Sequence, residues 1–357
     1  MAISAVNTIP LALEHAKRQL FRPFRFWQWA RLAAVGLLAG ELGGGGGNFN
    51  LGPRSGQQPQ IQVLRDLFHK IDPAVLASLA TVLVITGIVL AFVFAYISSV
   101  MRFILFDSIL TKECHIRAGW SRRQDIAWKY FLWQVGLGVS TFAGTIVIIG
   151  GPAVVAFSMG WFQTARAHVA QLVVLGIFAL ALLLFFIISI AIVHVFSKDF
   201  VVPQMAFEGI GALEAWRRLW PMIEGDAKAY LLYILMKIVL SIVAGIAIGV
   251  VGLTLGLILA VPIVGAVIAA VIAGKSAGWT LNAVTITAAV AAGCLIFAIF
   301  FFLVSLISVP AIVFFPAYSI YFFAARYQPL SLALYAPAPT GAVPGGTPYS
   351  PPPLPAV

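Results

Sequence analysis

Long uncharged runs of apolar residues alternate along the chain with short basic segments. Each of the longest runs exceeds the roughly 20 residues that a helix needs to cross the hydrocarbon of a bilayer. They predict spans near residues 74–100, 131–157, 170–196, 230–256 and 281–309. Because a bilayer offers the backbone no hydrogen-bond partners, spanning segments of this length are helices. The pattern therefore predicts an all-α, polytopic transmembrane helical bundle.

Two further stretches decide whether the bundle has about six spans. Residues 32–47 are short and end in a run of glycines, and we favour a weak crossing there. Residues 258–273 are expected to form a short piece that either crosses or turns back, which leaves the side of the C-terminal tail open. The Gly-Gly-Pro at residues 150–152 is expected to break or end a helix. Pro310 is expected to stop the last span, with an aromatic interfacial helix at 314–325.

The two ends of the chain differ from its middle. Residues 1–31 predict a basic, Trp-rich amphipathic helix that begins at Thr8 and is typical of a membrane surface. Its apolar face is expected to carry Leu13, Ala16, Leu20 and Phe24. Residues 336–357 hold eight of the 20 prolines, and this composition predicts an extended, disordered tail.

Composition excludes several classes of protein. Hydrophobic residues make up 61% of the 357 residues and charged ones 10%, and the mean hydropathy is +1.01. A soluble domain has roughly 45–50% apolar and about 25% charged residues, so a water-soluble enzyme and a disordered protein are excluded. The net charge of +10 indicates loops that face an anionic leaflet, and not nucleic acid. The basic segments 101–130 and 198–229 are separated by two spans, so both are expected in the cytoplasm.

The two basic segments share a pattern. Glu113 and Glu208 are each followed nine positions later by an arginine pair, and a tryptophan precedes each pair. The residues concerned are Arg122, Arg123 and Trp120 in the first copy and Arg217, Arg218 and Trp216 in the second. An internal duplication would produce this match, and so would a shared need for basic, aromatic anchors at the interface. The arginines and tryptophans either grip anionic lipid headgroups or serve topology alone. Residues 212–220 predict a second interfacial helix, with Leu213, Trp216 and Trp220 on one face.

Three stretches resemble a known group of sequences. They are the run Asp199-Phe200-Val201-Val202-Pro203-Gln204-Met205-Ala206, the run Leu213-Glu214-Ala215-Trp216-Arg217-Arg218, and the opening Phe21-Arg22-Pro23-Phe24-Arg25-Phe26 with its Glu41–Gly47 and Asn48-Phe49-Asn50. Over most of residues 8–330 the chain resembles bacterial integral membrane proteins similar to the glycerophosphodiester phosphodiesterase membrane domain. The resemblance implies a bacterial inner membrane and an association with phospholipid metabolism. The catalytic domain of that enzyme, with its His-Arg and Glu-x-Asp motifs, has no counterpart here.

No residue pattern predicts catalysis or a metal centre. Glu113-Cys114-His115 offers three ligand types, but adjacent residues cannot easily converge on one ion. Gly274-Lys275-Ser276 lacks the first glycine of a phosphate-binding loop and does not follow a strand. We therefore expect neither an enzyme nor a bound cofactor.

Lys237 is the strongest single candidate for a functional residue, because it carries a charge inside a predicted span. It lies roughly 10 Å along the helix from Tyr230. Intramembrane charges that face the bundle interior are usually functional, and Asp107 or Asp199 would then be its partner. Alternatively, its long stem snorkels to the nearby interface, and its shallow depth favours this second interpretation.

Glycines later in the same span are expected to serve helix packing. Gly245, Gly249, Gly252 and Gly256 fall on one helix face, where missing side chains let a neighbouring backbone approach. We expect this packing inside the monomer and not at a dimer seam.

The sequence thus favours a non-enzymatic membrane protein that organises lipids or a partner through its basic cytoplasmic loops. The alternative is a transporter or channel-like subunit for a small or lipidic substrate, with Lys237 lining a cavity between repeat halves. The scarcity of polar residues in the spans counts against ion coupling. Expected partners are anionic lipids on the cytoplasmic face; a protein partner stays open.

Overall fold

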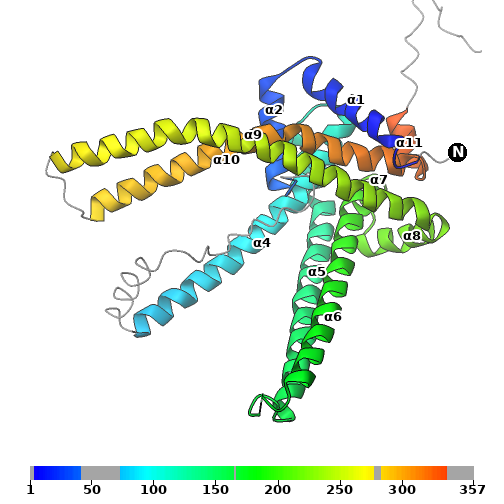
Figure 1. Cartoon of the computed structure of the whole chain (residues 1–357). Helices are drawn as coiled ribbons and strands as arrows, with labels where there is room; N and C mark the ends of the chain where they lie inside the picture. The colour runs from blue at the N-terminus through cyan, green and yellow to red at the C-terminus, as the bar shows by residue number, and fades with distance from the viewer. Residues whose placement is uncertain (1–3, 42–72, 165, 277–282, 336–357) are drawn as a thin grey trace, which may run out of the picture.

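The computed structural model describes residues 4–41, 73–164, 166–276 and 283–335, and every regular element in these ranges is a helix (Figure 1). The proline-rich tail predicted at 336–357 lies outside the described residues. The helices are α1 (Thr8–Phe21), α2 (Phe26–Leu38), α4 (Pro73–Thr111), α5 (Ile116–Ser158), α6 (Val169–Phe196), the π-helical turn η1 (Ser197–Val201), α7 (Val202–Glu208), α8 (Ala212–Gly225), α9 (Ala227–Ser276), α10 (Ala283–Ala324) and α11 (Gln328–Leu334).

The helices form a packed hub from which three arms extend (Figure 1). One arm is α4 alone, the second is the α5–α6 hairpin, and the third is the α9–α10 hairpin. The buried core lies in the hub, and in the arms the apolar side chains are largely exposed. The hub consists of α1, α2, η1, α7, α8, α11 and the inner ends of the long helices, at residues 99–111, 116–133, 192–196, 227–237 and 303–324.

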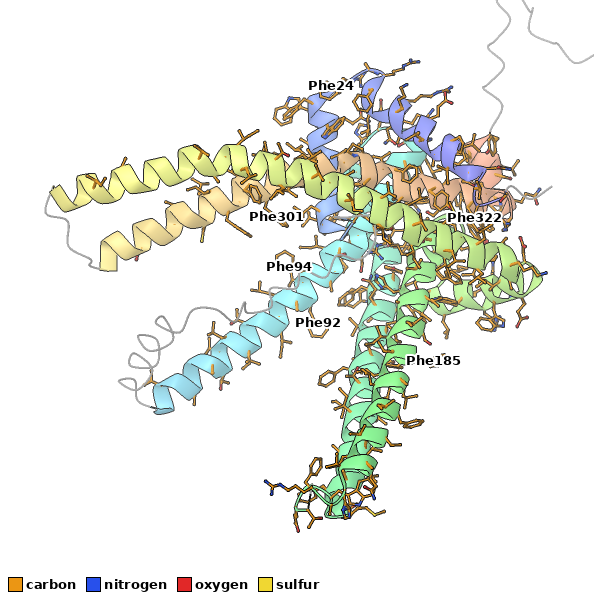
Figure 2. The ribbon with its side chains drawn as sticks, viewed as in Figure 1. Phe24, Phe92, Phe94, Phe185, Phe301 and Phe322 are labelled. Atoms are coloured by element: carbon orange, nitrogen blue, oxygen red, sulfur yellow. The ribbon has the colours of Figure 1, made fainter. Side chains whose placement is uncertain are left out.

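Five of the described helical segments are long and apolar enough to cross a membrane, which confirms the predicted fold class. They are Ala80–Thr111, Ile116–Ser158, Val169–Glu208, Ala227–Val261 and Ala291–Ala324. Phenylalanines such as Phe92, Phe94 and Phe185 project from the arms into open space (Figure 2). An apolar surface of this extent is expected to face lipid. The protein is therefore a polytopic helical membrane protein.

The predicted weak crossing at 32–47 is not found as a membrane-spanning helix. The helix there is α2, which begins at Phe26 and ends after 13 residues at Leu38, too short to cross a bilayer alone. It ends because Gly40 adopts a left-handed conformation with a φ of 78°. Residues 42–47 lie outside the described residues.

The expected helix breaks in the spans were wrong. α9 runs without interruption through residues 258–273, so this segment is neither a separate short piece nor re-entrant. α5 continues past residues 150–152 to Ser158, and α10 continues past Pro310 to Ala324. A proline inside a helix removes one backbone hydrogen bond, whereas a helix end leaves four carbonyls without partners. Where water is excluded, continuing the helix therefore costs less than ending it.

The amphipathic segment expected over residues 1–31 is interrupted, because α1 begins at Thr8 as predicted but ends at Phe21 and α2 begins at Phe26; α1 also buries a different face from the one expected. Ala16 and Leu20 are buried as expected, whereas Leu13 and Phe24 are exposed. The buried face also includes His15 and Gln19, because both side chains find hydrogen-bond partners on α4 and α10. His15 Nε2 donates to the carbonyl of Ile109 at 3.1 Å, its Nδ1 lies 3.1 Å from the hydroxyl of Tyr321, and Gln19 donates to the carbonyl of Ser108 at 2.9 Å.

The glycine face of α9 does not pack as predicted. A methyl group added at Gly245, Gly249 or Gly252 would meet no atom within 4 Å, and one at Gly256 would touch only the Phe300 side chain at 3.5 Å. No neighbouring backbone approaches these positions in the described residues.

Candidate functional site

Five ionic side chains from four parts of the chain meet where the arms leave the hub. Glu41 follows α2, Arg102 lies in α4, Lys198 and Asp199 lie in η1, and Lys237 lies in α9. Lys198 forms an ion pair with Glu41, and Lys237 forms one with Asp199. All four paired side chains are at most 9% exposed. Three cations thus face two carboxylates, an excess of one positive charge in a buried cluster.

Two adjacent residues of the π-helical turn face different partners. π-helical turns are rare and frequently lie at functional sites. In η1, Lys198 reaches Glu41, while Asp199 faces α9 and accepts hydrogen bonds from Lys237 and from the hydroxyl of Tyr233 at 2.9 Å. The Tyr233 ring stacks on Tyr318 of α10, with ring centroids 5.2 Å apart. The carboxylate of Asp199 is therefore held by two donors of α9, one of which, Tyr233, is itself packed against α10.

Arg102 is the one member of this cluster without a carboxylate partner among the described residues. Its Nη1 donates to the hydroxyl of Tyr130 at 2.8 Å, and its Nη2 donates to the carbonyl of Ala39 at 2.9 Å. Its Nε is buried and makes no hydrogen bond. A buried donor without a partner costs roughly 1–3 kcal/mol, so this guanidinium retains an unused capacity to bind an anion.

The three cations line a cavity of about 910 Å³ between α5, α6 and α9. His194 of α6 and Gln134 of α5 lie at the same polar end. Gln134 accepts a hydrogen bond from Ser99 through its carbonyl oxygen at 2.9 Å, which leaves its amide nitrogen without a partner in the described residues. The rest of the lining is mostly aliphatic and includes Leu137, Ile187, Ile190, Ile234, Ile238 and Ile242, with the hydroxyl side chains Thr141 and Ser241 among them.

This cavity has the size and the polarity of a binding site. Ligand sites typically enclose about 300–1,000 Å³ and combine apolar walls with a few placed polar groups. Here the three cations belong to the hub, and most of the apolar walls belong to the arms. The arrangement suits a molecule with an anionic head and an apolar body.

Comparison with known protein families identifies the family of the chain. It belongs to a family of unknown function, DUF7544, whose model matches residues 3–333. No curated protein and no solved structure matches the chain. Membership of DUF7544 assigns no activity, so the geometry of the cavity has to carry the functional argument.

In this DUF7544 protein, Lys237 has the second of its two predicted partners. Asp199 binds it, whereas Asp107 accepts hydrogen bonds from Arg122 at 2.9 Å and from Arg123 at 2.7 and 2.9 Å. The favoured expectation that Lys237 snorkels to the interface is wrong, because its side chain is 7% exposed and turned towards a buried carboxylate. That partner, held by Tyr233 as well, outweighs the reach of the lysine stem to water.

Three of the four arginines in the two pairs bind carboxylates of their own chain, namely Arg122, Arg123 and Arg218. Arg218 pairs with Glu208 and, at 2.6 Å, with Glu214. Arg217 is exposed and makes no ion pair among the described residues, and Arg122 is mostly exposed despite its contact with Asp107. Arg122 and Arg217 are thus the members of the two pairs that remain open to lipid.

The two tryptophans of the repeated pattern lie in different surroundings. Trp216 packs against the core and donates to the hydroxyl of Ser197 at 3.1 Å, a bond that Trp133 also makes, at 3.0 Å. Trp120 packs edge-on against Tyr96, with ring centroids 6.1 Å apart. On α8, Leu213 and Trp220 are exposed as expected of an interfacial face, but Trp216 anchors the helix to η1.

Sequence reasoning missed Glu41, Arg102, Lys198, His194 and Gln134. Arg102 and Lys198 were counted with the basic loops, because each lies next to one in the sequence. Glu41 carried a usable signal, since it is an acid between an apolar segment and a glycine run. An isolated acid there would have suggested a buried cation as partner.

Proposed function

We propose that this protein binds an amphipathic anion, a lipid or lipid-like molecule with an anionic headgroup, in the cavity between α5, α6 and α9. One observation carries the proposal: Arg102, Lys198 and Lys237 line the same 910 Å³ cavity as a set of aliphatic walls. Of the functions considered from sequence, this is the lipid-organising one, with the lipid held inside the protein instead of on its cytoplasmic loops.

The position of the cavity supports a lipid. The arms carry the exposed apolar surface, and both basic segments belong to the hub. With the hub on the cytoplasmic side of a bacterial inner membrane, the cationic end of the cavity lies near headgroup level and the aliphatic walls lie in hydrocarbon. A lipid of the cytoplasmic leaflet then needs no reorientation to enter.

The charges at the cationic end of the cavity are the reason for proposing an anionic ligand. A phosphate or carboxylate would accept charge-assisted hydrogen bonds from Lys198, Lys237 and the free Nε of Arg102. Glu41 and Asp199 hold the two lysines in place and reduce the repulsion between them. The excess positive charge that remains is neutralised when the anion binds.

A transporter for the same kind of molecule is the second candidate. Lys237 lines the cavity, as that alternative requires, and the walls come from two separate helical hairpins. Release of bound lipid into the opposite leaflet of proteoliposomes would favour transport over retention.

The test is native mass spectrometry of the full chain after exchange into an anionic phosphatidylglycerol or a zwitterionic phosphatidylcholine. Ile238→Trp fills the cavity, and Val239→Trp, the next position on α9, is the matched control because it is equally exposed but does not line the cavity. We expect the wild type and Val239→Trp to retain phosphatidylglycerol and Ile238→Trp to lose it.

A paired substitution tests the charges without leaving a buried ion alone. Glu41→Gln with Lys198→Gln removes one cation and its partner, so the protein should fold. Loss of one charge-assisted hydrogen bond, roughly 1.5 kcal/mol, corresponds to about tenfold weaker binding. Equal retention of both lipids by the wild type, or unchanged retention by Ile238→Trp, would refute the proposal.

A further inference from the structure

A second hollow lies between α1 of the hub and helices α9 and α10. Its volume is about 750 Å³, and it does not share a lining residue with the cavity described above. Of its described lining residues, Lys17 alone carries a charge. The others are Leu13, Ala16, Leu20 and Phe21 of α1, Leu240, Val243, Ala244, Ala247, Ile248 and Val251 of α9, and Ile307, Pro310, Ala311 and Phe314 of α10.

We propose that this groove binds an anionic phospholipid of the surrounding leaflet, with an acyl chain along the aliphatic floor and the headgroup phosphate against Lys17. The site is independent of the proposed cavity, because different residues build it. Val243 and Val251 belong both to the groove and to the exposed apolar surface of α9, so the groove opens directly onto the surface that faces hydrocarbon.

Lys17 is available to an external anion. It is exposed and has no ion pair among the described residues. Glu14, one helical turn before it, is already bound by Arg18, whose Nε and Nη2 donate to the same carboxylate oxygen at 3.0 and 2.5 Å. A lysine at the rim of an apolar groove can lay its stem on the apolar wall and present its ammonium to a phosphate.

The turn between α1 and α2 puts this rim at headgroup level. Phe21, Phe24 and Trp27 are all more than half exposed there, and Phe24 stands out from the turn in Figure 2. Exposed aromatic side chains beside arginines, here Arg22, are typical of the membrane interface. Trp29 donates from its indole nitrogen to the carbonyl of Leu306 at 2.9 Å. The turn is therefore fixed beside the segment of α10 that forms the groove.

Native mass spectrometry in phosphatidylglycerol nanodiscs tests the site. Ala247→Trp fills the groove, and Val250→Trp is the control because it is an exposed α9 position outside the lining. The wild type should retain two lipids, and Ala247→Trp should retain one. Adding Ile238→Trp, which fills the separate cavity, should remove the second. If the single variant Ala247→Trp loses one lipid and keeps the other, the lost lipid was bound in the groove and the retained one in the cavity.

The headgroup contact is tested by Lys17→Gln against Arg22→Gln, since Arg22 is also exposed but does not line the groove. We expect Lys17→Gln to weaken retention of the groove lipid about fivefold, as for one lysine at an anionic surface. Arg22→Gln should leave it unchanged.

Three results would overturn the proposal. One is two retained lipids in Ala247→Trp, and another is equal retention of phosphatidylglycerol and phosphatidylcholine in the groove. The third is a change from dimer to monomer in Ala247→Trp without loss of lipid, which would make a second copy of the chain the occupant. Ala244→Phe fills the same groove with a smaller ring and repeats the test if Ala247→Trp does not fold.

Discussion

Replacing Lys237 by methionine separates a buried ion pair from a lysine that merely reaches the interface. Methionine keeps the length and the apolar stem of lysine and removes its charge. In the structure the change leaves Asp199, 2% exposed, with the Tyr233 hydroxyl as its remaining described partner. Removing one member of a buried pair typically costs 3–5 kcal/mol, because an uncompensated charge remains.

That cost can be read from a thermal unfolding curve in detergent. For a chain of this length 1 kcal/mol shifts Tm by roughly 2 °C, so Lys237→Met should lower Tm by about 6–10 °C. Lys228→Met is the matched control: it changes an exposed lysine at the start of the same helix and should stay within about 0.5 kcal/mol of the wild type.

A double variant shows whether the loss comes from the charge that remains. Lys237→Met with Asp199→Asn removes both charges and keeps a polar partner for Tyr233. Neutral replacement of a buried pair is often close to neutral in stability, so the double variant should recover at least half of the lost Tm. If Lys237→Met behaves like Lys228→Met, or if the double variant is as unstable as the single one, Lys237 does not compensate the buried charge of Asp199 as argued.

Three further changes test other parts of the hub by the same unfolding assay. Arg123→Ala should cost about 2–3 kcal/mol, because it removes a bidentate contact with the Asp107 carboxylate and a hydrogen bond to a backbone carbonyl. Arg217→Ala changes an exposed arginine without an ion pair in the described residues and should cost nothing measurable. Equal Tm values for the two variants would contradict the Arg123 contact. Gly36→Ala should cost about 1–3 kcal/mol, because its methyl group would overlap the side chain of Ile312 in α10. Gly245→Ala meets open space and should be neutral or stabilising by up to about 1 kcal/mol. The opposite order of stabilities would refute the packing of α2 against α10. Burial lowers the pKa of His15 below its ordinary value of 6.5, so the stability that this residue contributes is fully present above pH 6.5 and is lost as the pH falls through the lower folded-state pKa. His15→Gln should flatten this acid-side loss of Tm, and an unchanged pH profile would count against the assignment.

The sequence predicts the helices well and their ends poorly. Apolar length alone identifies the spans, because a bilayer leaves the backbone no alternative to a helix. The local residue patterns that predict helix ends fail inside these spans. Residues 150–152 and Pro310 would end a helix in water, yet α5 and α10 continue through them. Conversely, α2 ends at Leu38, inside the crossing predicted at 32–47, because the left-handed Gly40 turns the chain there and Glu41 is held in the hub by its ion pair.

The site was partly accessible from the sequence. Lys237 could be singled out, because a charge within a long apolar run is conspicuous. Its partner could not be chosen, since Asp107 and Asp199 both lie near the ends of predicted spans. The ion pair between η1 and α9 distinguishes them only in the folded protein. Arg102 was concealed for a different reason, as it precedes a basic loop and a count of loop charges does not distinguish a buried arginine from a solvated one. Tertiary contacts, and not local pattern, decide which charges meet.

The composition of the buried cluster argues that it serves binding and not stability. Ion pairs inside a protein often contribute less than well-packed apolar residues of the same volume. A cluster kept only for stability would also balance its charges and satisfy its donors. Here three cations face two carboxylates, and Arg102 retains a buried Nε without a partner beside a 910 Å³ cavity. The excess positive charge and the unpaired Nε donor would both attract an anion, and both lie at the same end of the cavity. An anion at the cationic end of the cavity would correct the two together, whereas loss of the excess charge by mutation would correct only the first.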